Sequence, residues 1–193
     1  ARSDVKQAQV IEARVFLVGC PRSGTTLLQS LLAAHSRVAS FPETHFLSGL
    51  RPGKRAYRAL GLASRAATGR LETFCQELGR QPPVWPSRWE RLFARSMFRA
   101  FVRLLDRLAL EAGASVWLEK TPNHLRHVEE IESHLPSAKL LHIVRNGRET
   151  VLSLYRTTRD HPERWGGAWS LERCVERWNE SVRLTAAHAG KPN

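Results

Sequence analysis

A run of small, hydroxyl-bearing and basic residues follows one short apolar segment, in the order GCPRSGTT at residues 19–26. Its two glycines, five residues apart, allow a tight turn in which backbone N–H groups and hydroxyls converge on an anion. If a helix begins where the turn ends, the positive end of its dipole adds to that attraction. The pattern predicts a phosphate-binding loop whose ligands are Arg22, Ser23, Gly24, Thr25 and Thr26. The simpler interpretation is a turn that only caps the helix.

The loop differs from that of nucleoside triphosphatases in its charged residues. The triphosphatase motif needs a lysine directly after its second glycine, to reach the β- and γ-phosphates, and Thr25 stands there. The apolar segment 139–144 ends in Arg145, where such an enzyme often places a magnesium-binding aspartate. The basic residue of the loop is Arg22 instead. The sequence therefore predicts a phosphate site that needs no metal.

Groups suited to proton transfer follow two other short apolar segments. Glu43 and His45 come after segment 37–41, and Lys120 comes after segment 115–118. If these segments are parallel strands, their carboxyl ends meet at one edge of the sheet, beside the phosphate loop. Glu43 is then the candidate general base, and His45 is the alternative because imidazole titrates near neutral pH.

Strands alternating with helices must position these groups. We expect two short helices within 47–80 and a long amphipathic helix over 88–112, whose apolar stripe includes Leu92 and Phe93. Apolar segments bounded by turns predict strands at 11–19, 37–41, 115–118 and 139–144. Further helices are expected at 27–35, 124–134, 150–155 and 171–189, with a loop over 160–169. This order predicts an α/β fold with a mainly parallel central sheet.

Composition excludes several classes of protein. The 193 residues are 42% hydrophobic and 25% charged, which is typical of a packed domain and not of a disordered or fibrous chain. The apolar run Val15–Cys20 is far too short to span a membrane, and three cysteines make no disulfide framework or zinc site. The net charge of +12 suits an anionic partner such as a nucleotide, acidic glycan, nucleic acid or membrane surface, or simply a solvated basic surface.

Several motifs together resemble sulfotransferases that use 3′-phosphoadenosine 5′-phosphosulfate (PAPS). PRSGTTLL after a buried strand resembles the loop that binds the 5′-phosphosulfate. KLLHIVRNGRETVLSLY, at 139–155, resembles the segment that binds the 3′-phosphate, with Arg145 and Ser153 at the matching positions. ETHF at 43–46 and LERCVERWNESV at 171–182 are similar to the branch of tyrosylprotein and bacterial sulfotransferases.

The resemblance implies a P-loop-like three-layer fold and metal-independent transfer of a sulfuryl group from PAPS to a hydroxyl, leaving adenosine 3′,5′-bisphosphate (PAP). Glu43 matches the base of the tyrosylprotein branch, and Arg22 would stabilise the leaving phosphate. Lys120 would contact the sulfuryl oxygens, and His45 would contact the acceptor. The cytosolic branch places a catalytic histidine after a Lys-Thr pair, but Pro122 stands there in this chain. Trp117, Trp165, Trp169 and Trp178 could stack on adenine, line the cleft or pack in the core.

We expect residues 1–193 to form a single sulfotransferase-like domain in which a helical insertion, 47–114, shapes the acceptor site. The family usually continues beyond the last matched helix, so the chain is a compact member or lacks a C-terminal part. The acceptor is a carbohydrate, peptide or small metabolite, with no specific nucleic acid as partner. The oligomeric state stays open. The polar N-terminus predicts a cytoplasmic protein, or a Golgi or exported form whose leader has been removed. The alternatives are a basic nucleotide-binding module without turnover and a P-loop nucleotide kinase.

Overall fold

Four parallel strands form the central sheet of this computed structural model, which describes residues 10–82, 85 and 87–193. The order across the sheet is β2-β3-β1-β4. The strands are β1 (Ala13–Gly19), β2 (Val38–Ser40), β3 (Val116–Lys120) and β4 (Lys139–Ile143). The polar N-terminus, residues 1–9, and residues 83, 84 and 86 lie outside the described residues.

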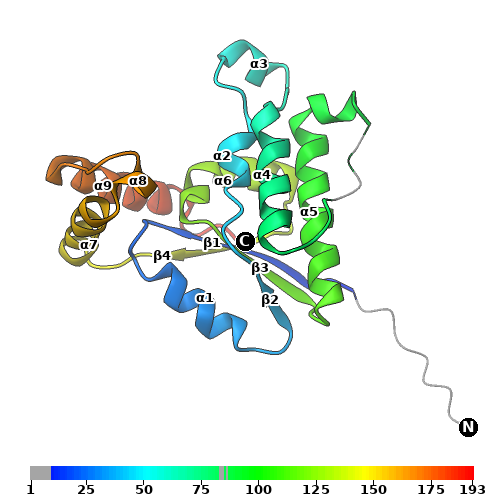
Figure 1. Cartoon of the computed structure of the whole chain (residues 1–193). Helices are drawn as coiled ribbons and strands as arrows, with labels where there is room; N and C mark the ends of the chain where they lie inside the picture. The colour runs from blue at the N-terminus through cyan, green and yellow to red at the C-terminus, as the bar shows by residue number, and fades with distance from the viewer. Residues whose placement is uncertain (1–9, 83–84, 86) are drawn as a thin grey trace, which may run out of the picture.

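Helices flank the sheet on both faces, which confirms the expected three-layer α/β fold (Figure 1). On one face lies α1 (Thr25–Ala33), and on the opposite side lie α2 (Phe46–Leu50), α4 (Arg65–Glu77), α5 (Ala94–Glu111) and α6 (Val128–His134). The other elements are α3 (Arg55–Ala59), η1 (Glu90–Leu92), η2 (Pro122–His127), α7 (Gly147–Asp160), α8 (Pro162–Trp165) and α9 (Leu171–His188). Along the described chain, no helix combines the length and apolar character that crossing a membrane requires.

The central strand β1 carries the continuous apolar run that a strand covered on both faces requires. Phe16, Leu17 and Val18 are fully buried there. The ring of Phe16 meets Trp117 of β3 edge-on at 5.2 Å between centroids, and the indole N–H of Trp117 donates a 2.7 Å hydrogen bond to Asp106. Trp117 is therefore a core residue and is not available to stack on a nucleotide.

The long helix α5 begins later than its apolar stripe predicts. Phe93 is extended, and the backbone around it pairs with 61–63 through hydrogen bonds from Ala63 to Leu92 and from Ala94 to Gly61. Leu92 and Phe93 are each 48% exposed, so including them in the buried stripe was wrong. Two short helices were expected within 47–80, but the segment contains most of α2 and all of α3 and α4. Helix α8 lies within the loop expected at 160–169.

Candidate functional site

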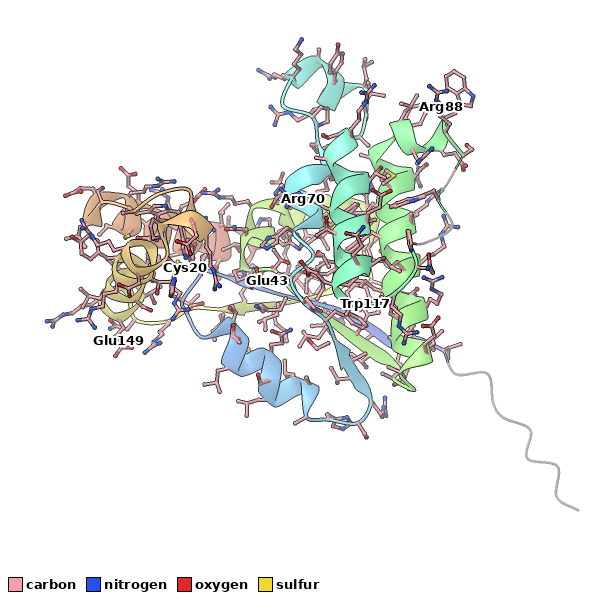
Figure 2. All side chains as sticks on the ribbon, viewed as in Figure 1. Cys20, Glu43, Arg70, Arg88, Trp117 and Glu149 are labelled. Carbon is pink, nitrogen blue, oxygen red and sulfur yellow. The ribbon has the colours of Figure 1, made fainter. Side chains whose placement is uncertain are left out.

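The predicted site residues lie at the carboxyl ends of strands or in the loops and helices that follow them, and parallel pairing brings those strand ends to one edge of the sheet. Leu17 of β1 is paired with Lys120 of β3, and Gly19 at the end of β1 is paired with Ile143 of β4. Glu43 lies in the segment between β2 and α2, at the same edge (Figure 2). The crevice outside these strand ends is where open α/β sheets bind their ligands.

The loop between β1 and α1 begins at Gly19, where the backbones of β1 and β4 approach closely. A Cβ added at Gly19 would lie 2.7 Å from the carbonyl oxygen of Ile143, so only glycine allows this approach of β1 to β4. Gly24 takes a left-handed conformation at φ 102° and precedes the first residue of α1. The start of α1 has no side-chain cap hydrogen bond and its first turn contains no acidic residue, so neither competes with an anion for the N–H groups there.

The predicted phosphate ligands divide into two groups. Ser23 is buried and directs both its backbone N–H and its hydroxyl to the carbonyl of Cys20, at 3.1 and 2.6 Å. The side chain of Ser23 therefore closes the loop. Arg22, Thr25 and Thr26 line a cavity of about 550 Å³. Arg22 takes a left-handed backbone conformation, at φ 71°, and is exposed.

This cavity, called the loop cavity below, joins the β1–α1 loop to four other segments. Glu43 and His45 form part of its wall. Its remaining lining comes from η2, α7, α8 and nearby residues, namely Pro21, Pro122, Asn123, Thr157, Asp160, His161, Arg164 and Trp165. The sequence analysis missed the α7–α8 wall because segment 160–169 carries no recognisable motif and was expected to be a loop. Trp165 and Trp169 of that segment were both considered for adenine, the cleft or the core, and Trp165 lines the loop cavity.

The structure brings Glu43, His45 and Lys120 into contact. One carboxylate oxygen of Glu43 accepts a 2.5 Å hydrogen bond from the Lys120 ammonium, and the other lies 3.5 Å from Nε2 of His45. Lys120 is 8% exposed at its side chain, whereas Glu43 is 32% exposed. The predicted base, its alternative and the predicted cation therefore share one cluster at the wall of the loop cavity.

His45 is held in an unusual conformation with a perturbed imidazole. Its φ of 48° is left-handed, and it precedes the first residue of α2. Burial lowers the pKa of His45, and the nearby positive charge of Arg70 adds to that effect while Glu43 opposes it. The lowered pKa favours the neutral imidazole, which is able to accept a proton.

A fully buried carboxylate, Glu119 of β3, anchors the segment that carries Glu43. Glu119 accepts hydrogen bonds from the hydroxyls of Thr44 and Thr121, at 2.8 and 2.6 Å. It also lies 2.9 Å from Nδ1 of His124, whose Nε2 accepts a hydrogen bond from the N–H of Leu47. The ring proton of His124 is therefore on Nδ1 and is donated to Glu119.

The hydrogen-bond partners of Glu119 determine the direction in which its pKa is shifted. Burial alone would raise the pKa of Glu119, but its interactions with His124 and the two threonine hydroxyls hold that pKa below its usual range. Sequence analysis missed Glu119, although a glutamate inside a short apolar strand is a usable signal. Glutamate is almost never fully buried unless it is paired.

Ser153 contacts the phosphate loop, whereas Arg145 pairs with a residue four positions further along the chain. Ser153 accepts a 3.1 Å hydrogen bond from Nε of Arg22, which links α7 to the phosphate loop. Arg145 is about half exposed, pairs with Glu149 at 2.7 Å and is not among the residues lining the loop cavity. Within the described part of the chain, no group of three or more His, Cys, Asp or Glu side chains is placed to hold a metal ion.

Comparisons with known proteins agree with this geometry. A sulfotransferase domain of the Synechococcus PCC 7002 olefin synthase superposes with a TM-score of 0.55 and 23% identity, covering 93% of this chain and 62% of that one. The fold is thus that of sulfotransferase domains. The model of the sulfotransferase family matches residues 14–192, and the chain belongs to that family.

Two relatives show how far sequence similarity extends. The nodulation protein NoeE of Sinorhizobium fredii is 29% identical over 160 residues, which is 82% of this chain and 33% of that protein. The protein-tyrosine sulfotransferase of Drosophila melanogaster is 27% identical over 185 residues, covering 88% of this chain and 30% of that protein. The chain therefore spans about a third of the length of these relatives.

Proposed function

We propose that this protein transfers a sulfuryl group from PAPS to a hydroxyl acceptor without a metal ion. The observation that carries the proposal is that a lysine-free phosphate loop and the Glu43–Lys120 pair meet at one cavity. Arg22 and Thr25 line that cavity on the loop side, and Glu43 lines it on the other. Membership of the sulfotransferase family supports the same chemistry.

The residues around the loop cavity fit the donor. The open N–H groups at the start of α1, together with Arg22 and Thr26, suit the 5′-phosphosulfate. We assign Arg145 and Ser153 to the 3′-phosphate, since Ser153 already contacts Arg22 and Arg145 can exchange its exposed partner Glu149 for a dianion. Bound PAPS supplies an activated sulfuryl group, and the protein supplies a base and positive charge.

Sulfuryl transfer to a hydroxyl requires a group that accepts the hydroxyl proton and groups that stabilise the leaving phosphate. The acceptor oxygen forms a bond to sulfur while the bond between sulfur and the bridging phosphate oxygen breaks, which leaves PAP. Glu43 takes the acceptor proton, so the products are a sulfate ester, PAP and one proton. Arg22 stabilises the charge that develops on the leaving phosphate, and Lys120, nearly buried and 2.5 Å from Glu43, faces the sulfuryl oxygens.

The helical segment 47–114 is proposed to shape the acceptor site of a single domain spanning 1–193. Its helix α4 lies on the same side of the sheet as α2, which follows directly after His45. A hydroxyl brought to Glu43 from this side would face the base without crossing the phosphate loop. The family usually acts on hydroxyl groups, and His45 is the proposed acceptor contact.

Incubation with sulfur-labelled PAPS and a panel of carbohydrate, peptide and small-metabolite acceptors tests the reaction. We expect labelled sulfate ester and PAP to form in equal amounts in the presence of a chelator. PAP binding that weakens steeply with salt and is accompanied by no turnover would favour the nucleotide-binding module instead. Phosphoryl transfer from ATP that depends on Mg²⁺ would favour the kinase.

Replacing Arg145 by alanine tests the 3′-phosphate assignment. Removing a bidentate, charge-assisted contact to a dianion should weaken PAP binding by about 2–3 kcal/mol. The binding of adenosine 5′-phosphate, which lacks the 3′-phosphate, should hardly change. Titration calorimetry of both nucleotides measures the difference, and Ser153→Ala should cost PAP only about 1 kcal/mol.

The matched control for Arg145→Ala is Glu149→Ala, which removes the exposed partner of Arg145 without removing the guanidinium. If Arg145 serves the nucleotide, the loss of Glu149 frees it and PAP binds no more weakly than before. Equal losses of both nucleotides in Arg145→Ala would show instead that Arg145 serves folding.

A further inference from the structure

A second cavity, of about 360 Å³, adjoins the loop cavity. Glu43 and His45 line both cavities, so the candidate base forms the wall between them. Most of the remaining lining of this second cavity comes from α4. It is called the α4 cavity below.

The α4 side of this cavity is one stripe of the helix. The stripe recurs at the spacing of one helical face and consists of Ala66, Gly69, Arg70, Thr73, Phe74 and Glu77. Gly69 is exposed, and a Cβ there would meet no atom within 4 Å, so the cavity is open at this position of the helix. A mid-helix glycine lowers stability relative to alanine, and packing against a neighbour does not require glycine here.

Arg70 is the charged residue of this stripe whose electrostatic effect reaches His45 beside the candidate base. Its Nε is buried and has no hydrogen-bond partner, and within the described part of the chain its guanidinium forms no ion pair. Its side chain lies against Gly49 of α2, where an added Cβ would be 2.5 Å from Nε. Its positive charge reaches His45, whose pKa it lowers. Figure 2 shows Arg70 and Glu43 on the same side of the sheet.

The other charged residue of the stripe is too distant to neutralise Arg70. Glu77 follows Arg70 by seven residues, which is about 10 Å along a helix, and it is exposed. A half-buried guanidinium without a carboxylate partner is unusual, because desolvated charges in proteins are normally paired. The partner that Arg70 lacks within the chain can be supplied by a ligand in the α4 cavity.

We infer that the α4 cavity binds the acceptor, and that this acceptor is a small hydroxy compound carrying an anionic group such as a carboxylate. This inference rests on the proposed sulfuryl transfer only for the hydroxyl end, which would face Glu43. Arg70 binds the anionic end through charge-assisted hydrogen bonds and thereby fixes the distance between anion and hydroxyl. Gly69 provides room for the body of the molecule.

The test uses hydroxy acids, each paired with its uncharged amide, such as 4-hydroxybenzoate, 4-hydroxyphenylacetate and 3-(4-hydroxyphenyl)propanoate. Calorimetry on the PAP-saturated protein should find at least one acid that binds roughly tenfold or more tightly than its amide. Arg70→Gln should abolish that preference, and Gly69→Leu should weaken both members of the pair by filling the cavity. Arg65→Gln, which removes an arginine from the same helix outside the cavity, should preserve the preference.

This experiment tests the role of Arg70 separately from the proposed sulfuryl transfer. Acids and amides that bind alike, or a preference that survives Arg70→Gln, would overturn the role of Arg70, whatever the protein does to PAPS. A preference lost equally in Arg65→Gln would also overturn it, since only general charge would then matter. Acid binding that depends on Arg70 without any sulfuryl transfer would support the anion site and contradict the proposed reaction.

Discussion

Glu43→Gln should lower turnover by roughly 10²–10⁴-fold, which is the usual contribution of a general base. Glutamine keeps the size of glutamate and can still accept a hydrogen bond from Lys120, but it cannot take the acceptor proton. PAP affinity should stay within about threefold, because the base is not assigned a nucleotide contact. Single-turnover rates with labelled PAPS, measured beside PAP calorimetry, separate the chemical step from binding.

His45→Asn is the matched comparison, because the two residues share one short segment and lie 3.5 Å apart. We expect a much smaller loss of turnover than in Glu43→Gln. If His45→Asn loses most activity while Glu43→Gln keeps it, the neutral imidazole is the base, as the lowered pKa of His45 permits. If both variants stay active, the base lies outside segment 43–46.

Glu119→Gln should lower the free energy of unfolding by about 2–3 kcal/mol, although Glu119 touches neither cavity. The amide cannot replace a carboxylate that accepts hydrogen bonds from two threonine hydroxyls and His124. Because Thr44 is one of those donors, segment 43–46 should also lose its fixed position and turnover should fall. Urea denaturation measures the stability, and Glu176→Gln, at an exposed position on α9, should stay within about 0.5 kcal/mol.

The stability difference between wild type and Glu119→Gln should depend on pH with a defined sign. The folded-state pKa of Glu119 is lowered, so the ionised form stabilises the fold above the unfolded-state pKa of about 4.3. That contribution is lost as the pH falls through the folded-state pKa. The difference should therefore be constant near neutral pH and shrink below pH of about 4. A difference that grows in acid would contradict this.

The sequence was sufficient to predict the parallel sheet and the edge at which the candidate residues lie, because strand ends and loop motifs are local patterns. Gly19, Arg22, Glu43 and Lys120 each follow a short apolar run, and parallel pairing alone brings such positions together. The Glu43–Lys120 contact itself could not be read from the sequence, because it depends on side-chain direction across 77 positions.

Features that depend on packing between distant segments were missed or misplaced. Periodicity extended the apolar stripe to Leu92 and Phe93, but pairing of this backbone with 61–63 means that α5 begins only after them, at Ala94. The α4 cavity arises because one face of α4 and segment 43–45, more than twenty positions earlier, line the same space, and no sequence motif records this. Arg145 was assigned to the 3′-phosphate by resemblance. Its ion pair with Glu149 is seen only in the three-dimensional structure.

Nucleotide titration with and without Mg²⁺ tests the central claim, a phosphate loop that binds a sulfuryl donor without metal. Thr25 replaces the lysine that a triphosphate requires, and Arg145 follows β4 in place of a magnesium-binding aspartate. We predict that PAP binds with the same affinity in chelator and in Mg²⁺, and more tightly than ATP in both. A requirement for Mg²⁺, or a preference for ATP, would contradict the account.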